Sequence, residues 1–93
     1  MFEWNPDKDN TNIAKHNVSF DDAKMAFLDQ KRLVYEDAEH STHEKRWFCI
    51  GVVRDRVLTV RFTMREKKIR IIGAAYWRKG RAEYEKENGN IKD

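Results

Sequence analysis

The feature that most constrains the fold is an alternation of side chains over residues 57–64. One set of alternate residues is apolar throughout, namely Leu58, Val60, Phe62 and Met64. The other set is mixed, namely Val57, Thr59, Arg61 and Thr63. Successive side chains of a β-strand point to opposite faces, so this segment is predicted to be a strand of a sheet covered on one side only.

Further segments are predicted to be strands because they are short and rich in β-branched or aromatic residues: 2–4, 32–36, 45–53 and 69–74. Polar turns at residues 54–56 and 65–68 join three of these strands in succession. Turns this short connect antiparallel neighbours, since parallel strands need a crossover of about a dozen residues or more. The sheet is therefore expected to be mostly antiparallel.

Two helices are predicted in the first third of the chain. Residues 6–16 form the first, because Asn5 is a good N-cap and proline suits the first helical turn. Asn17 suits the left-handed conformation that often ends a helix. Ser19 then caps a second helix, which places Phe20, Ala23 and Phe27 on one face.

A third helix is expected from near Gly80 to about Asn88, with Glu83 in its first turn, and residues 89–93 are expected to fray. The predicted fold class is thus α+β, a mostly antiparallel sheet with two N-terminal helices and a C-terminal helix. Because 93 residues bury only one modest hydrophobic core, the whole chain is predicted to be a single domain.

Charge is distributed unevenly along the chain. Residues 1–44 carry five Lys and Arg against ten Asp and Glu, which gives −5, whereas residues 45–86 carry thirteen against four, which gives +9. A basic segment after an acidic one is expected when one face of a protein meets an anionic polymer such as RNA. A solvated strand surface is the alternative explanation.

A single cysteine excludes an internal disulfide and a multi-cysteine metal site. Cys49 lies in the apolar run 47–50 and is expected to be buried as a small hydrophobic residue. The sequence has no apolar run near the roughly 18 to 20 residues that span a bilayer, and its first residues do not resemble a signal peptide. We therefore expect a cytoplasmic protein without a membrane contact.

Histidines and strand arginines are the residues that could carry chemistry. RNA can be cut without metal when a base removes the 2′-hydroxyl proton, an acid protonates the leaving oxygen and cations stabilise the phosphorane. His16, His40 and His43 lack the spacing of a zinc site, so neither metal nor cofactor is expected. Four arginines on adjacent strands could meet on one face and hold phosphate oxygens: Arg46, Arg61, Arg65 and Arg70. Each could equally be a solvated strand residue.

Short motifs in a characteristic order extend over nearly the whole chain. They include Phe2-Glu3-Trp4-Asn5-Pro6, Lys8, Asn12, Lys15-His16, Val18-Ser19-Phe20, Ala23, Phe27, Tyr35, Asp37, His40, Glu44, Arg46, Ile50-Gly51, Thr63, Arg65 and Ile69-Arg70-Ile71-Ile72. On these residues the chain resembles the BrnT family of toxins. Two departures are Asn17 where the family often has glycine, and Ala75 where many members have arginine.

The resemblance implies a RelE-like fold and a metal-independent endoribonuclease that halts translation. It also implies a BrnA-type antitoxin whose ribbon-helix-helix module binds DNA, so that the toxin reaches DNA only through its partner. Two alternatives from other classes are a non-catalytic RNA-binding protein and a structural partner in a repressor complex. RNA cleavage by the purified protein would distinguish the first reading from the others.

Site residues are predicted on this basis. The expected catalytic set is His40, Arg46, Arg65, Arg70 and His16, and the expected RNA-binding set is Lys15, Arg61, Arg78, Lys79 and Arg81. The last three could replace the charge that Ala75 removes. His40 is the favoured acid or base because it stands between Asp37 and Glu44 and leads into the basic strand. The rival hypothesis is that His40 only pairs with Asp37 to hold its loop.

Overall fold

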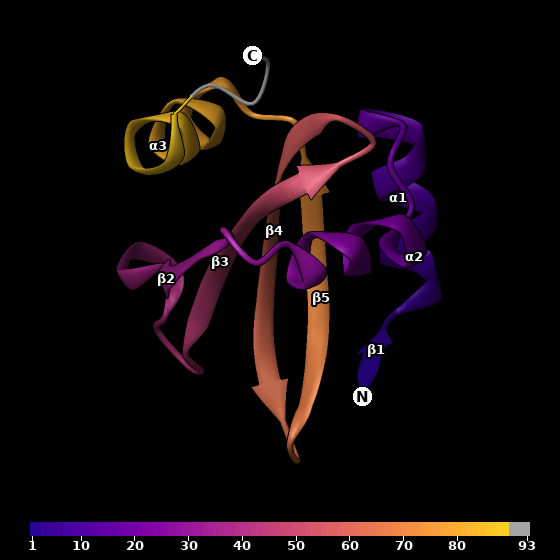
Figure 1. The fold of residues 1–93 in the computed structure, drawn as a ribbon. Helices are drawn as coiled ribbons and strands as arrows, with labels where there is room; N and C mark the ends of the chain where they lie inside the picture. Colours follow the sequence, from indigo (N-terminus) through magenta and orange to yellow (C-terminus); the bar gives the residue numbers. More distant parts are fainter. Residues whose placement is uncertain (90–93) are drawn as a thin grey trace.

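A computed structural model describes residues 1–89 and contains a five-stranded sheet with helices packed on it (Figure 1). The elements in chain order are β1 (Phe2–Trp4), α1 (Pro6–His16), α2 (Phe20–Ala23), η1 (Lys24–Leu28), β2 (Leu33–Glu36), η2 (Ala38–His40), β3 (Arg46–Val53), β4 (Arg56–Arg65), β5 (Lys68–Ala75) and α3 (Arg78–Asn88), where η marks a 3₁₀ helix. The strand order is β1-β5-β4-β3-β2. β1 runs parallel to β5 and the other neighbours are antiparallel, which confirms the predicted α+β class.

Strand positions agree with the sequence prediction to within one residue at each end. Both tight turns have two successive residues with positive φ. In the β3–β4 turn these are Arg54 (54°) and Asp55 (67°), and in the β4–β5 turn they are Glu66 (50°) and Lys67 (68°). Two positive φ values in a row match the twist of a two-residue hairpin, although glycine and asparagine are the usual residues there.

The first helix begins and ends as predicted. The Asn5 side chain accepts a hydrogen bond from the backbone of Asp7 at 2.8 Å, and Asn17 is left-handed at φ 57°. Asn12 connects α1 to the edge of β5 through two hydrogen bonds with Ala74. Its Oδ1 accepts from the N–H of Ala74 at 3.1 Å, and its Nδ2 donates to the carbonyl of Ala74 at 2.9 Å. A side chain thus takes the place of a neighbouring strand at this edge.

The second N-terminal helix is shorter than predicted. Ser19 caps it as expected, accepting from the backbone of Asp22 at 3.0 Å, but α2 is one turn long and continues as the 3₁₀ helix η1. The buried residues Phe20, Ala23 and Ala26 recur every third position, and three residues per turn is the period of a 3₁₀ helix. The sequence prediction of a second full helix was therefore wrong in its second half.

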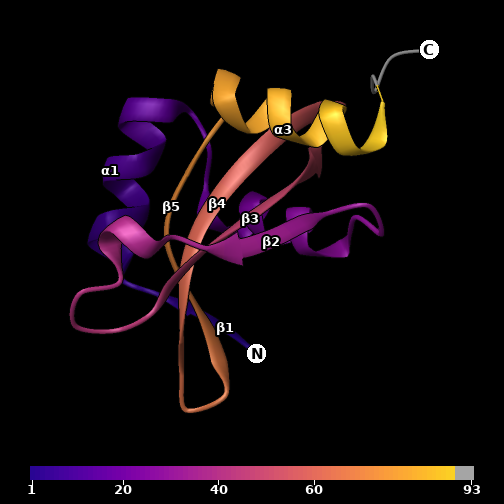
Figure 2. The ribbon, with the colours of Figure 1, turned by 90° about the vertical axis from the view of Figure 1, so that its left-hand side faces the viewer.

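Both faces of the sheet carry a packed core. Under α2 and η1 lies the larger core, made of Val18, Phe20, Ala23, Ala26, Cys49, Val53, Leu58, Val60, Phe62, Ile71 and Ala74. α3 crosses the other face at one end (Figure 2), where Tyr84 packs with Ile50 and Val57. Because α3 covers Val57 and Thr59, the prediction of a sheet covered on one side only was wrong for this end of β4.

α3 begins at Arg78, two residues before the predicted start, with Trp77 as its N-cap. Gly80 therefore lies inside the first turn and Glu83 falls outside it. A Cβ at Gly80 would overlap the hydroxyl of Thr59, so this glycine allows α3 to approach β4 closely. Of the tail expected to fray, Gly89 follows the helix, and residues 90–93 lie outside the described part of the chain.

Cys49 is fully buried, as predicted, and burial raises the pKa of its thiol to about 12. Between residues 1 and 89, none of the helices combines the length and the apolar character needed to cross a membrane.

Candidate functional site

The face of the sheet that carries α3 is only partly covered. Register pairs Arg46 with Thr63, Phe48 with Arg61, Tyr35 with Phe48 and Thr63 with Arg70, so these side chains share a face. α3 covers the end of this face near Ile50. The remainder, which we call the open face, consists of Tyr35, Arg46, Phe48, Arg61, Arg65 and Arg70. All four strand arginines singled out from the sequence therefore lie on it.

One end of the open face contains a polar hollow of about 440 Å³ between the η2 loop and β4. It is lined by Glu39, His40, Thr42, His43, Glu44, Arg46 and Arg65. Glu44 lies between two arginines, with its Oε2 3.4 Å from Nη2 of Arg65 and 4.0 Å from Nη2 of Arg46. The polar hollow thus brings two histidines, two carboxylates and two guanidinium groups together.

His40 is held in place by Asp37. Its Nδ1 lies 2.8 Å from Oδ2 of the buried Asp37, while half of the His40 side chain is exposed. Ser41 steadies the same loop, because its hydroxyl donates to the carbonyl of Asp37 at 2.7 Å and accepts from the N–H of Arg46 at 2.9 Å. The contact engages Nδ1, which leaves Nε2 as the ring nitrogen facing other partners.

Asp37, Glu39 and His40 could also offer ligand atoms to a metal, since one atom of each lies within 4.8 Å of the others. Sequence spacing of the histidines did not suggest this grouping. The Asp37 carboxylate already bonds His40, and Glu39 is exposed. The hydrogen bond between Asp37 and His40 at the start of the loop accounts for the approach of these two groups.

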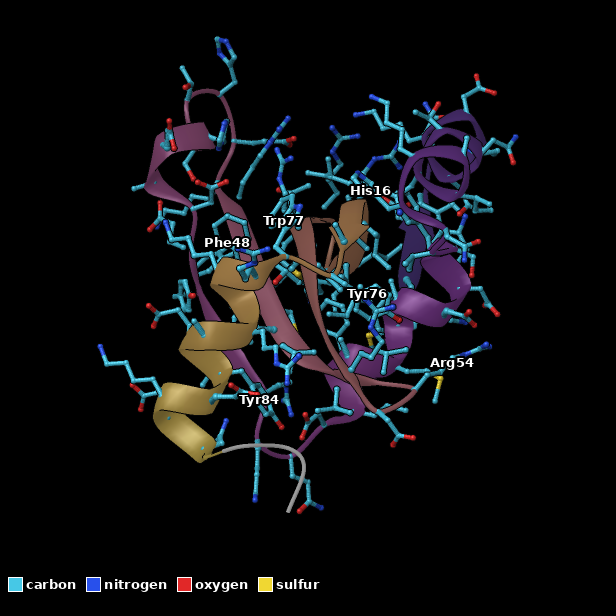
Figure 3. The ribbon with its side chains drawn as sticks, turned by 90° about the horizontal axis from the view of Figure 1, so that it is seen from above. His16, Phe48, Arg54, Tyr76, Trp77 and Tyr84 are labelled. Carbon is cyan, nitrogen blue, oxygen red and sulfur yellow. The ribbon has the colours of Figure 1, made fainter. Side chains whose placement is uncertain are left out.

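An aromatic hollow of about 270 Å³ adjoins the polar hollow. It is lined by Tyr35, His40, Phe48, Ile50, Thr59, Arg61, Trp77, Lys79 and Gly80. Phe48 and Trp77 lie close together in Figure 3, with ring centroids 6.5 Å apart in an edge-to-face arrangement. His40 lines both the polar and the aromatic hollow, so the two hollows are adjacent.

A third hollow, of about 280 Å³, lies between α1 and β5. Its lining includes Lys8, Lys15, His16 and Arg61. Arg61 therefore lies between this hollow and the aromatic one, and within residues 1–89 it has no ion-pair partner. Arg70 instead pairs with Glu3 of β1 at 3.4 Å and lines none of the three hollows. His16 and His40 thus line different hollows, and Arg70 is not part of the lining of the polar hollow, although Thr63, its partner across the sheet, is two residues from Arg65.

The start of α3 is unusually basic. Trp77 gives no side-chain cap, and the first turn has no acidic residue but includes Arg78, Lys79 and Arg81. Cations at the positive end of a helix dipole cost about 0.3–1 kcal/mol each, whereas an anion bound there is favoured. Of the three, Arg81 is partly neutralised by Glu85 at 2.9 Å. Their position fits a surface for phosphate groups.

Arg78 and Arg81 also line a small hollow with Arg56 and Tyr76. The guanidinium of Arg56 lies 3.9 Å from the centre of the Tyr76 ring. Ala75, the departure noted in the sequence, is buried at the end of β5. The basic residues of α3 begin three positions later, so positive charge persists at this end of the sheet.

Sequence reasoning missed two parts of the site. It assigned no role to Trp77, which is 39% exposed and lines the aromatic hollow, whereas Trp4 and Trp47 pack against the core. It also passed over Glu44 as a functional residue. The signal available was its position, because Glu44 precedes Arg46 by two residues in the loop that leads into β3.

This fold and this surface define a class: a small α+β protein whose sheet presents acid–base groups and cations suited to a phosphodiester. The family model described as ribonuclease toxin, BrnT, of type II toxin-antitoxin system matches residues 4–80, and the chain belongs to that family. A comparison with curated proteins found no match.

Proposed function

We propose that the protein cleaves RNA internally, without metal or cofactor, and thereby inhibits translation. Membership of a ribonuclease toxin family supports RNA as the substrate. The observation that carries the finer proposal is the polar hollow, where His40, Glu44, Arg46 and Arg65 line one space. These four side chains supply an acid, a base and two fixed cations, which is what cleavage through the 2′-hydroxyl requires.

In the proposed reaction, the Glu44 carboxylate accepts the proton of the 2′-hydroxyl, and the oxygen attacks the adjacent phosphorus. The bond from phosphorus to the 5′ oxygen breaks, and protonated His40 donates a proton to the leaving oxygen. The products are a 2′,3′-cyclic phosphate and a free 5′-hydroxyl. Arg46 and Arg65 stabilise the extra negative charge on the phosphorane, because each guanidinium can bond two oxygens.

The remaining basic residues hold the RNA backbone on either side of the scissile bond. Lys15, His16 and Arg61 surround the hollow beside α1, and the start of α3 adds Arg78, Lys79 and Arg81. In this proposal His16 and Arg70 bind phosphate and take no part in proton transfer, since both lie outside the polar hollow. Phosphate contacts of this kind position a substrate without reading its sequence.

A type II toxin has an antitoxin partner, and we propose one of BrnA type with a ribbon-helix-helix module. An acidic or apolar segment of the antitoxin would cover the open face and block the polar hollow. DNA would then be contacted only through the antitoxin. We place both proteins in the cytoplasm, where translated RNA is available.

Cleavage of a labelled RNA by the purified protein in excess chelator tests this proposal. The wild-type protein should cut the RNA and leave a 2′,3′-cyclic phosphate, and His40→Gln should be slower by roughly a hundredfold or more. His43→Gln is the matched control, because His43 lines the same hollow but has no role in the proposed reaction. Expression alone should stop growth, and co-expression of the antitoxin should restore it.

Recovery of activity only after a divalent metal is added would overturn metal independence. RNA binding without any cleavage would instead support the alternative of a non-catalytic RNA-binding or repressor-complex protein. An unchanged rate and pH profile in His40→Gln would leave His40 with the structural role of pairing with Asp37.

A further inference from the structure

The aromatic hollow leaves large rings open to solvent. Tyr35 is 40% exposed and Trp77 is 39% exposed, and both lie edge-to-face against Phe48, with centroids 6.1 and 6.5 Å from its own. Rings of this size are usually buried in a domain, because they contribute much of the apolar area of its core. The three rings around this hollow therefore form an exposed apolar surface on which a planar ligand could stack.

The size of the aromatic hollow restricts what could occupy it. At about 270 Å³ it is slightly smaller than the roughly 300 Å³ at which pockets for drug-sized ligands begin. One planar ring system fits this space better than a larger ligand. Single-stranded RNA offers such rings, because its unstacked bases turn outward and stack on aromatic side chains.

Two polar atoms beside this hollow lack hydrogen-bond partners among residues 1–89. Oγ1 of Thr59 lies against Gly80 of α3 and is covered by it, whereas Nε of Arg61 belongs to a guanidinium group at the margin of the hollow. A buried polar group without a partner costs about 1–3 kcal/mol, so such groups are rare in folded proteins. The edge of a base carries carbonyl oxygens and ring nitrogens that accept hydrogen bonds from such donors.

Charge around the aromatic hollow favours a nucleotide over a peptide segment of an antitoxin. His40, Arg61 and Lys79 are at its margin, and no acidic residue in the described part of the chain lines it, although burial and the negative charge of Glu83 raise the pKa of Tyr35. Lys79 belongs to the uncapped first turn of α3, where backbone N–H groups are free to bind a phosphate. His40 also lines the polar hollow, so a base bound here is connected directly to the proposed site of cleavage.

We propose that the aromatic hollow binds one base of the RNA next to the cleaved bond and determines the sequence preference of cleavage. The rings of Tyr35, Phe48 and Trp77 hold the base, and the guanidinium of Arg61 bonds its edge. This inference rests on the proposed ribonuclease function and extends it to a site that determines specificity. Binding of a base at this site can be measured without any cleavage of RNA.

The first test is binding of the four nucleoside 3′-monophosphates, measured by calorimetry. We expect the wild-type protein to prefer one of them, and Trp77→Ala to weaken its binding by about tenfold or more. Trp77→Phe keeps a ring and should recover much of the affinity. Leu28→Ala is the matched control, since Leu28 is exposed on η1, on the opposite face of the sheet.

Arg61→Gln gives a second test that does not depend on removing a ring. Glutamine removes a guanidinium group whose Nε has no hydrogen-bond partner among residues 1–89, so thermal stability should change by less than about 1 kcal/mol. The preference among the four nucleotides should nevertheless fall several-fold. Sequencing of cleaved RNA ends should show the same loss of preference in this variant, with kcat changed less than KM.

The outcomes separate this inference from the proposed function. Absence of RNA cleavage together with selective nucleotide binding would overturn the ribonuclease proposal and support the base site. Cleavage with the same sequence preference in wild type, Trp77→Ala and Arg61→Gln would overturn the base site. Loss of antitoxin neutralisation in Trp77→Ala, with nucleotide binding unchanged, would also overturn it and identify the hollow as a protein-docking site.

Discussion

The hydroxyl of Tyr84 in α3 donates a hydrogen bond of 2.6 Å to Oδ2 of Asp29, between η1 and β2. The same carboxylate accepts 2.9 Å bonds from the backbone of Val52 and of Lys31. Burial alone would raise the pKa of Asp29, but these three hydrogen bonds outweigh it and the pKa lies below its ordinary value. Burial and the bond to Asp29 raise the pKa of Tyr84 to about 12. One carboxylate thus joins α3 to the sheet.

Asp29 should make the free energy of unfolding decrease at low pH. Its folded pKa is lower than its unfolded pKa of about 3.9, so its contribution is complete above that value and disappears as pH falls through the folded pKa. We expect Asp29→Asn to lower the free energy of unfolding at neutral pH by about 1–3 kcal/mol and to flatten the acid-induced decline. Urea unfolding across this pH range, with the exposed Asp21→Asn as control, measures both. Parallel curves for wild type and Asp29→Asn would contradict the assignment.

Gly80→Ala should destabilise the protein even though alanine favours a helix. The gain in helix propensity is about 1 kcal/mol, whereas overpacking against the Thr59 hydroxyl costs about 1–3 kcal/mol. We expect a net loss of up to roughly 2 kcal/mol in thermal or urea unfolding. Glu87→Ala is the control, because at this exposed position of α3 the substitution changes helix propensity without changing packing. A more stable Gly80→Ala variant would show that α3 does not need this close approach.

Lys67→Gly should stabilise the β4–β5 hairpin. Lys67 has φ of 68°, and the left-handed conformation costs a side-chain-bearing residue roughly 1–2 kcal/mol that glycine avoids. Because glycine also gains freedom in the unfolded chain, we expect a net increase of about 0.5–1 kcal/mol in the free energy of unfolding. Lys68→Gly, one residue later within β5, should destabilise instead. Equal effects at the two positions would argue against the φ explanation.

Glu44→Gln distinguishes a proton acceptor from a residue that only restrains arginines. A general base predicts a fall in kcat of roughly a hundredfold or more with folding stability changed by less than about 1 kcal/mol, as for a partly exposed ion pair. Glu39→Gln in the same hollow should have little effect. If Glu44 only neutralises Arg46 and Arg65, its replacement would strengthen RNA binding and leave kcat intact.

Cys49 should resist thiol reagents in the folded protein. Its side chain is fully buried and the pKa of the thiol is raised to about 12, so the reactive thiolate is scarce at neutral pH. Alkylation should become rapid only in guanidinium chloride. Rapid modification of the native protein, without loss of its circular dichroism, would show that the core opens around β3.

Alternation and turn chemistry were sufficient to predict the strands, because they depend on neighbours in sequence. The period of two from Leu58 to Met64 reflects a property that each strand residue shows locally. Coverage of the second face could not be predicted in this way. It depends on Tyr84 reaching Ile50 and Val57 from a distant helix, and on the absence of a side chain at Gly80.

The site shows the same division. Sequence alone indicated that the strand arginines could share a face, but which of them lies beside which carboxylate depends on register. Arg65 meets Glu44 because β3 and β4 pair with Arg46 opposite Thr63. Arg70 meets Glu3 because β1 adds in parallel to β5. Both pairings join residues more than twenty positions apart, which no local pattern specifies.

The hydrogen bonds between Asn12 and Ala74, together with the parallel pairing of β1 and β5, have a consequence for synthesis of the protein. Residues near the start of the chain pair with residues about sixty positions later, so the sheet is complete only after β5 has been synthesised. On the ribosome, the nascent chain therefore cannot assemble the open face until β5 has emerged from the exit tunnel. We therefore expect the open face to be completed late in folding, after β5 has paired with both β1 and β4.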